Sequence, residues 1–167
     1  PTDYIFPIFI FIVGVSLVLS ITKQREKGMS RDQLVKKIIW RSIKIYLVGL
    51  FLWLWPSFDF SSIRWVGVLQ RIALVFLVCS LLFFYAKRKT QLIITAVILI
   101  FYALIVQYLP VPGIGMPDLS EPGKNWANFI DYNLLPGYQW KKTWDPEGIL
   151  SSFPAIVTGI LGMMAGY

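Results

Sequence analysis

Two arginines in an otherwise apolar stretch are the residues whose types and spacing most suggest chemistry. Arg71 interrupts the uncharged run 65–86, and Arg64 lies seven positions before it. A charge at membrane depth costs at least a few kcal/mol unless it is paired or hydrated. On a continuous helix both guanidiniums would share a face about 10 Å apart, with Gly67 between them to let a ligand approach the backbone. Such forked donors suit an anionic ligand or an acid on a neighbouring helix, and Arg64 alone also fits an interfacial anchor.

Three carboxylates border predicted apolar helices. Asp145, Pro146 and Glu147 form a typical helix start, with an N-cap acid, a first-position proline and a first-turn acid. That pattern needs no function, yet both carboxylates would face the outer compartment, where a cationic or hydroxyl-rich substrate could meet them. Asp3 precedes the first apolar run. It would either cap that helix or orient a histidine or an amine.

Aromatic residues and prolines concentrate in the segment 110–145. Loops of this length are uncommon and are usually functional or disordered, and the aromatic content argues against disorder. Trp126 and Trp144 would either stack on a sugar ring or belong to a membrane-interface belt. Residues 125–133 are expected to form a short helix.

The absence of histidine and the single cysteine limit the kinds of catalytic and metal sites that this sequence can form. The chain has no histidine and one cysteine, Cys79. The commonest general base and most zinc-site patterns are therefore absent, and no intrachain disulfide can form. We find no phosphate loop and no cluster of metal ligands, so we predict that no metal takes part.

The elements that must position these residues are membrane helices. Hydrophobic residues make up 56% of the 167 residues and charged residues 15%, against about 25% charged in soluble domains. The composition excludes an ordinary cytosolic enzyme and predicts an all-α, polytopic transmembrane bundle. We expect one domain, residues 1–167, with an extracytoplasmic loop at 110–147. The expected spans are 4–21, 38–58, 65–86, 91–109 and 148–167.

Smaller patterns refine this prediction. Ser30 to Gln33 fits a capping box, which would open a helix lying on the membrane surface or presenting an anion-binding face. Arg41 and Lys44 would then reach the headgroups from the inner end of the second span. Small residues recur every four positions near the end of the chain, which is typical of close helix packing in lipid. They are Ser151, Ala155 and Gly159, and Gly162 and Gly166.

The distribution of cations predicts the orientation. Eleven lysines and arginines lie in 22–44 and 86–90, and four lie in the two alternate loops. By the positive-inside rule, 22–44 and 86–90 are cytoplasmic. The net charge of +7 is then a topology signal, and we expect no nucleic-acid partner, although a basic chain in general suggests one.

Several segments, in order, resemble one family. They are residues 3–14 (DYIFPIFIFIVG), 67–73 (GVLQRIA), 109–113 (LPVPG), 129–131 with 134–135 (FID and LL) and 145–150 (DPEGIL). The chain resembles a bacterial member of the heparan-alpha-glucosaminide N-acetyltransferase family, and is expected to be an internal piece of a longer protein.

The resemblance implies a plasma-membrane enzyme that moves an acetyl group from cytoplasmic acetyl-CoA to an amino sugar on the outer side. The family's proposed catalytic histidine falls just upstream of Asp3, which would orient it, and this fragment alone is expected to be inactive. From sidedness we expect Arg64, Gln70 and Arg71 at the acyl donor and Asp145, Glu147, Trp126 and Trp144 at the sugar. The expected partners are the bilayer, acetyl-CoA and an amino-sugar or glycan acceptor, and a second copy of the chain is a further candidate. The alternatives are a permease or channel subunit and a membrane O-acyltransferase acting on envelope glycans.

Overall fold

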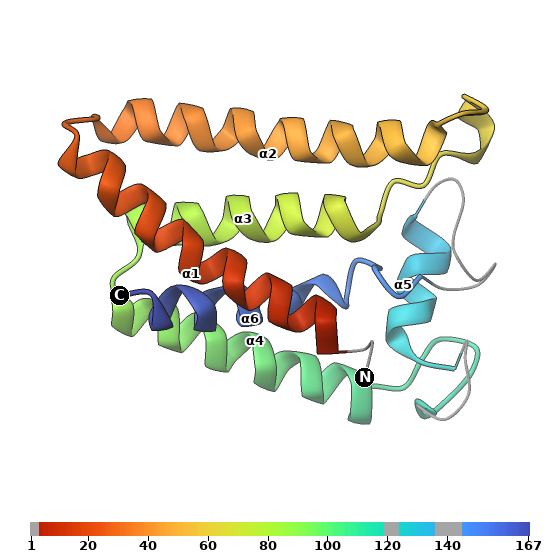
Figure 1. Ribbon diagram of the computed structural model, residues 1–167. Coiled ribbons are helices and arrows are strands. Elements are labelled where there is room, and N and C mark those ends of the chain that lie inside the picture. The colour runs from red at the N-terminus through yellow and green to blue at the C-terminus, as the bar shows by residue number, and fades with distance from the viewer. Residues whose placement is uncertain (1–3, 119–123, 136–144) are drawn as a thin grey trace.

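The computed structural model describes residues 4–118, 124–135 and 145–167, and the described part is helical without a strand (Figure 1). The predicted all-α class is therefore confirmed. The helices are α1 (Ile5–Glu26), α2 (Arg31–Leu54), α3 (Val68–Tyr85), α4 (Arg88–Tyr108), α5 (Trp126–Leu134) and α6 (Ser152–Ala165), with a short 3-10 turn at Phe60–Ser62.

The five longer helices lie side by side, and α5 sits across one end of them (Figure 1). Helix α6 packs against α1, α3 and α4, and α2 packs mainly along α3. The α1–α2 and α3–α4 connections share one end with the C-terminus, whereas α5 and the α2–α3 connection share the other (Figure 1). The two segments predicted to be cytoplasmic thus turn at the same end.

Glycines let α1 and α6 approach backbone to backbone. A Cβ at Gly14 would lie 2.2 Å from the carbonyl oxygen of Gly159, and one at Gly162 would lie 2.0 Å from that of Phe11. These distances leave no room for a side chain, so the small residues are required by the packing. The predicted close packing of the last helix is confirmed, with α1 as its partner.

Three of the described helices are long and apolar enough to cross a membrane: α1, α3 and α4. Helix α2 is longer but carries six charged residues. Helix α6 has 14 residues, a length of about 21 Å against about 30 Å of hydrocarbon. Five spans therefore remain a prediction.

Helix α2 differs from the expected surface helix followed by a span. It is continuous from Arg31, and the connection to α1 is residues 27–30 only. The predicted capping box is confirmed, because Ser30 accepts from the Gln33 N–H and the Gln33 side chain accepts from the Ser30 N–H. Strong helix formers carry the helix straight through Lys36 and Lys37, so the cations lie along α2 instead of in a loop.

Two helices begin later than predicted. Helix α3 begins at Val68 after an extended Gly67, so Arg71 lies in its first turn and Arg64 lies outside it. The two arginines therefore do not share a helix face. Helix α6 begins at Ser152 and not at residue 148, because the preceding acids have other partners. Helix α5 agrees with the prediction for 125–133, with the Asn125 side chain as its N-cap.

Candidate functional site

A buried ion-pair cluster joins the segment before α3 to the segment before α6. Arg64 donates through Nε to Oδ2 of Asp145 at 2.9 Å and through Nη2 to Oδ1 at 2.6 Å. Its Nη2 also donates to Oε2 of Glu147. Arg64 and Asp145 are 9% and 3% exposed. A two-pronged guanidinium–carboxylate pair is strong when it is shielded from water, so Arg64 fixes the place of both acids.

A carboxylate from α5 shapes the same segment. Asp131, 1% exposed, accepts hydrogen bonds from the backbone N–H of Ile149, at 2.9 Å, and of Asp145. Gly148 is needed beneath it, since a Cβ there would lie 1.8 Å from Oδ2 of Asp131. Asp131 therefore holds residues 145–149 as a turn and delays the start of α6.

Arg71 reaches this turn from α3. Its Nη2 donates to the Pro146 carbonyl at 2.8 Å and to the Ser151 hydroxyl. Its Nε is buried without a hydrogen-bond partner, and no carboxylate of the described residues lies within 4.0 Å of it. Both acceptors are neutral, so Arg71 forms no ion pair within the described part of the chain.

Arg71 lines a cavity of about 400 Å³ between α2, α3 and the turn. The cavity is mainly apolar, with polar atoms from Gln70, Arg71, Glu147 and Ser42. The hydroxyl of Ser42 is, like Nε of Arg71, buried without a partner among the described residues. An apolar cavity of this size with a few convergent polar groups is typical of a small-molecule site.

Gln70 is positioned by two glycines. A Cβ at Gly49 or at Gly67 would come within 2.8 Å of Oε1 of Gln70. The predicted role of Gly67 is thus revised: its missing side chain makes room for the Gln70 carboxamide. Gln70 is 8% exposed and contributes to the cavity wall.

Burial raises the pKa of two acids at the site. It raises the pKa of Asp131 to about 6, against the lowering effect of the hydrogen bonds from Ile149 and Asp145. It also raises the pKa of Glu147 above its ordinary value, partly opposed by Arg64. Carboxylates with raised pKa values beside a cavity are candidates for proton transfer.

The structure brings together five of the eight predicted site residues, namely Arg64, Gln70, Arg71, Asp145 and Glu147. Of the two acids only Glu147 lines the cavity, because Arg64 occupies both oxygens of Asp145. Trp126 instead donates from its indole N–H to the Leu109 carbonyl at 2.8 Å and packs on Phe129, which anchors α5 to α4. Asp3 and Trp144 lie outside the described residues.

Sequence reasoning missed Asp131 and Ser151. A single acid in a short loop helix has no distinctive spacing, and its bond to Ile149 crosses 18 residues. Ser151 was noted only as one of the small residues. The signal for Asp131 was present within residues 129–131, one of the segments that carry the family resemblance.

Comparison with known proteins identifies the family of the chain. The chain matches the family described as "Heparan-alpha-glucosaminide N-acetyltransferase, catalytic" over residues 2–138. It is 29% identical over 214 aligned positions to the heparan-alpha-glucosaminide N-acetyltransferase of Mus musculus, covering 98% of this chain and 32% of the relative. The Homo sapiens protein of the same name is 28% identical over 213 positions, with the same coverage. The chain thus spans about a third of the length of these relatives, and it belongs to the heparan-alpha-glucosaminide N-acetyltransferase catalytic family.

Proposed function

We propose that the complete protein transfers an acetyl group from cytoplasmic acetyl-CoA to the amine of an amino sugar on the outer side of a bacterial plasma membrane. The observation that carries this proposal is the cavity beside α3, which is lined by Arg71 and Glu147. The Nε of Arg71 is buried and has no hydrogen-bond partner among the described residues. Membership of an acetyltransferase family supplies the class of reaction.

Acetyl transfer from a thioester to an amine has three requirements. A base must remove a proton from the ammonium group, donors must stabilise the oxyanion on the thioester carbonyl, and the reactants must be held in line. The C–S bond breaks as the C–N bond forms, and the thiolate leaves with a proton as CoA. The amine proton goes to the base.

The cavity residues fit two of these requirements. Arg71, with Gln70 one position before it, would hold the acyl donor or stabilise its oxyanion, because a guanidinium with an unused N–H is a preorganised donor. Glu147 would receive the ammonium group of the sugar. Arg64 and Asp145 would position Glu147 through their buried pair.

The remaining requirement, a base, is assigned to residues outside the described part. Asp3 would orient a histidine upstream of this chain, which would act as the base or as a transient acetyl carrier. Asp3 directly precedes Tyr4 in the sequence, and α1 begins at the end of the bundle that α5 shares (Figure 1). The base would then enter from the same end of the bundle as the ion-pair cluster.

Reconstitution of the complete protein tests the proposal. Purified protein in liposomes, supplied with radiolabelled acetyl-CoA on one side and glucosamine on the other, should form labelled N-acetylglucosamine. Acceptors with a hydroxyl in place of the amine should not be labelled. Label on a hydroxyl acceptor would favour an O-acyltransferase, and movement of an anion without acetyl transfer would favour a permease.

A further inference from the structure

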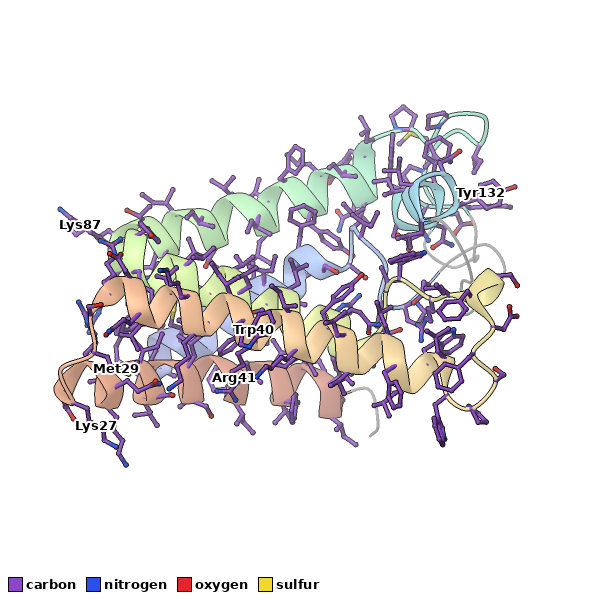
Figure 2. All side chains as sticks on the ribbon, turned by 90° about the horizontal axis from the view of Figure 1, so that it is seen from above. Lys27, Met29, Trp40, Arg41, Lys87 and Tyr132 are labelled. Atoms are coloured by element: carbon purple, nitrogen blue, oxygen red, sulfur yellow. The ribbon has the colours of Figure 1, made fainter. Side chains whose placement is uncertain are left out.

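The site proposed above leaves the cations of α2 without a role. Lys37, Arg41 and Lys44 follow one another at helical spacing and are all exposed, with Lys36 on the adjoining stripe. These four residues are called the α2 basic face. Figure 2 shows Arg41 and Trp40 projecting from the middle of α2. They lie far from the two ends of the bundle, which Lys27 and Tyr132 mark in that view.

The contacts of α2 with α3 show how deep this face lies. Arg31 packs over the ring of Tyr85, at 4.1 Å, at the end of α3. Arg41 packs over the ring of Phe76, at 5.1 Å, in the middle of α3. Arg41 is about 15 Å and Lys44 about 20 Å beyond Arg31 along the helix. Arg41 therefore lies beside the middle of α3, a helix that is long and apolar enough to cross a membrane.

The basic face has no acid opposite it in the described part of the chain. Both ion pairs found there belong to Arg64. Lys37 donates to the neutral Oε1 of Gln24, at 2.6 Å, and Lys44 lies over the Trp40 ring. Cations at membrane depth are costly unless they meet an anion or water. Among the described residues, no acid neutralises this face, so its cations are open to an anionic ligand.

The α2 basic face extends from the end of the bundle that holds the α1–α2 and α3–α4 connections, here called the basic end, toward the 400 Å³ cavity (Figure 1). Helix α1 diverges from α2 beyond their connection (Figure 1), and a small cavity there is lined by Ser20, Gln24, Lys37 and Arg41. At the other end, Lys44 is three positions before Leu47, which lines the 400 Å³ cavity. Residues three apart are neighbours on a helix surface. A ligand on the basic face could thus extend into the cavity.

We propose that the α2 basic face binds the phosphate groups of acetyl-CoA and lets its acyl arm reach Arg71. This inference rests on the proposed function. Four closely spaced cations complement a ligand that carries a diphosphate and a further phosphate, and lysine and arginine are the usual phosphate donors. The uncharged arm of the ligand suits the apolar cavity wall.

Two thioester donors test this in the complete protein: acetyl-CoA and S-acetylpantetheine, which carries the same thioester without phosphates. The variant Lys37→Gln/Arg41→Gln/Lys44→Gln should raise the KM for acetyl-CoA by about tenfold or more, because each hydrogen bond to a charged group is worth about that factor. Its kcat, and its KM for S-acetylpantetheine, should stay within about twofold of wild type. The matched control is Lys89→Gln, an exposed cation of α4 at the basic end, which should change neither.

Other outcomes overturn the proposal. An unchanged KM for acetyl-CoA, or equal changes for both donors, would remove the phosphates from this face. An activity that instead follows the content of phosphatidylglycerol in the liposomes would assign the face to lipid. If the triple variant does not fold, Lys44→Gln alone must still weaken acetyl-CoA and spare S-acetylpantetheine. Calorimetric binding of CoA needs no turnover, so weakened CoA binding in the variant would stand even if acetyl transfer is never observed.

Discussion

Arg64 and Arg71 reach the same turn but have different kinds of partner. Arg64 donates to two carboxylates, whereas Arg71 donates to a carbonyl and a hydroxyl among the described residues. The sequence singled out both residues but could not assign their partners, since Arg64 and Asp145 are 81 residues apart. A charged residue in an apolar run can be recognised from the sequence around it. The acid that pairs with it can be identified only from the tertiary structure.

Asp131 gives the site a pH-dependent stability. Its pKa in the folded protein, about 6, is above the ordinary value of 3.8, so the folded state holds its proton more tightly than the unfolded state. The stabilising contribution is present at low pH and is lost as the pH rises from about 4 to 6. We expect the melting temperature of the complete protein to fall across this range, and Asp131→Asn to reduce that fall.

The control for this experiment is Asp32→Asn, an exposed acid at the start of α2, which should keep the wild-type pH profile. A reduced fall is expected instead of none, because burial also raises the pKa of Glu147. Identical profiles for wild type and Asp131→Asn would contradict the raised pKa of Asp131.

At the scale of elements, α1, α3 and α4 could be predicted from their uncharged runs. The starts of α3 and α6 could not. Local residues at 145–147 favour a helix, but the Arg64–Asp145 pair and the Asp131–Ile149 bond take the groups that a helix start would use. The continuity of α2 also differs from the predicted surface helix followed by a separate span, because lysine is a good helix former and nothing breaks the helix between the two.

The contact between α1 and α6 depends on glycine. At Gly162 a Cβ would lie 2.0 Å from a backbone oxygen of α1, which cannot move without shifting the helix. We expect Gly162→Ala to destabilise the complete protein by about 1–3 kcal/mol, as overpacking does. Thermal unfolding followed with a thiol-reactive dye measures this.

The control is Leu161→Ala on the exposed side of α6, where the side chain is 45% exposed. This variant should unfold near the wild-type temperature. If the two variants unfold alike, the close approach of α1 and α6 would not be a determinant of stability.

At the scale of the whole molecule, much apolar surface is left uncovered. Helix α4 exposes Ile93, Ile100 and Phe101 at 61–63%, far more than a water-soluble surface of this size carries in one patch. Lipid, or the remaining two thirds of a protein of the relatives' length, would cover it. The composition predicted this property, but it does not determine the number of spans, because α2 carries six charged residues and α6 has only 14 residues.

The orientation predicts which residues are reachable from outside. In a complete protein whose other cysteines are removed, Met116→Cys should react with an impermeant maleimide added to intact cells. Met116 is 64% exposed and follows α4 at the end shared with α5, whereas Lys27→Cys at the opposite end should react only after permeabilisation. The reverse pattern would invert the orientation and place the ion-pair cluster on the cytoplasmic side.

The central claim is that Arg71 and the cavity beside it form the site of acetyl transfer. The most direct measurement is acetyl transfer and thermal unfolding on the same preparations of wild type, Arg71→Ala, Arg71→Lys and Arg64→Ala. We expect Arg71→Ala to fold and to lose about a hundredfold or more in kcat, as loss of an oxyanion donor does, with poor rescue by lysine. Arg64→Ala should instead unfold at a lower temperature than wild type, because it removes the guanidinium that pairs with the buried carboxylate of Asp145. A folded Arg71→Ala protein that turns over at the wild-type rate would contradict the account.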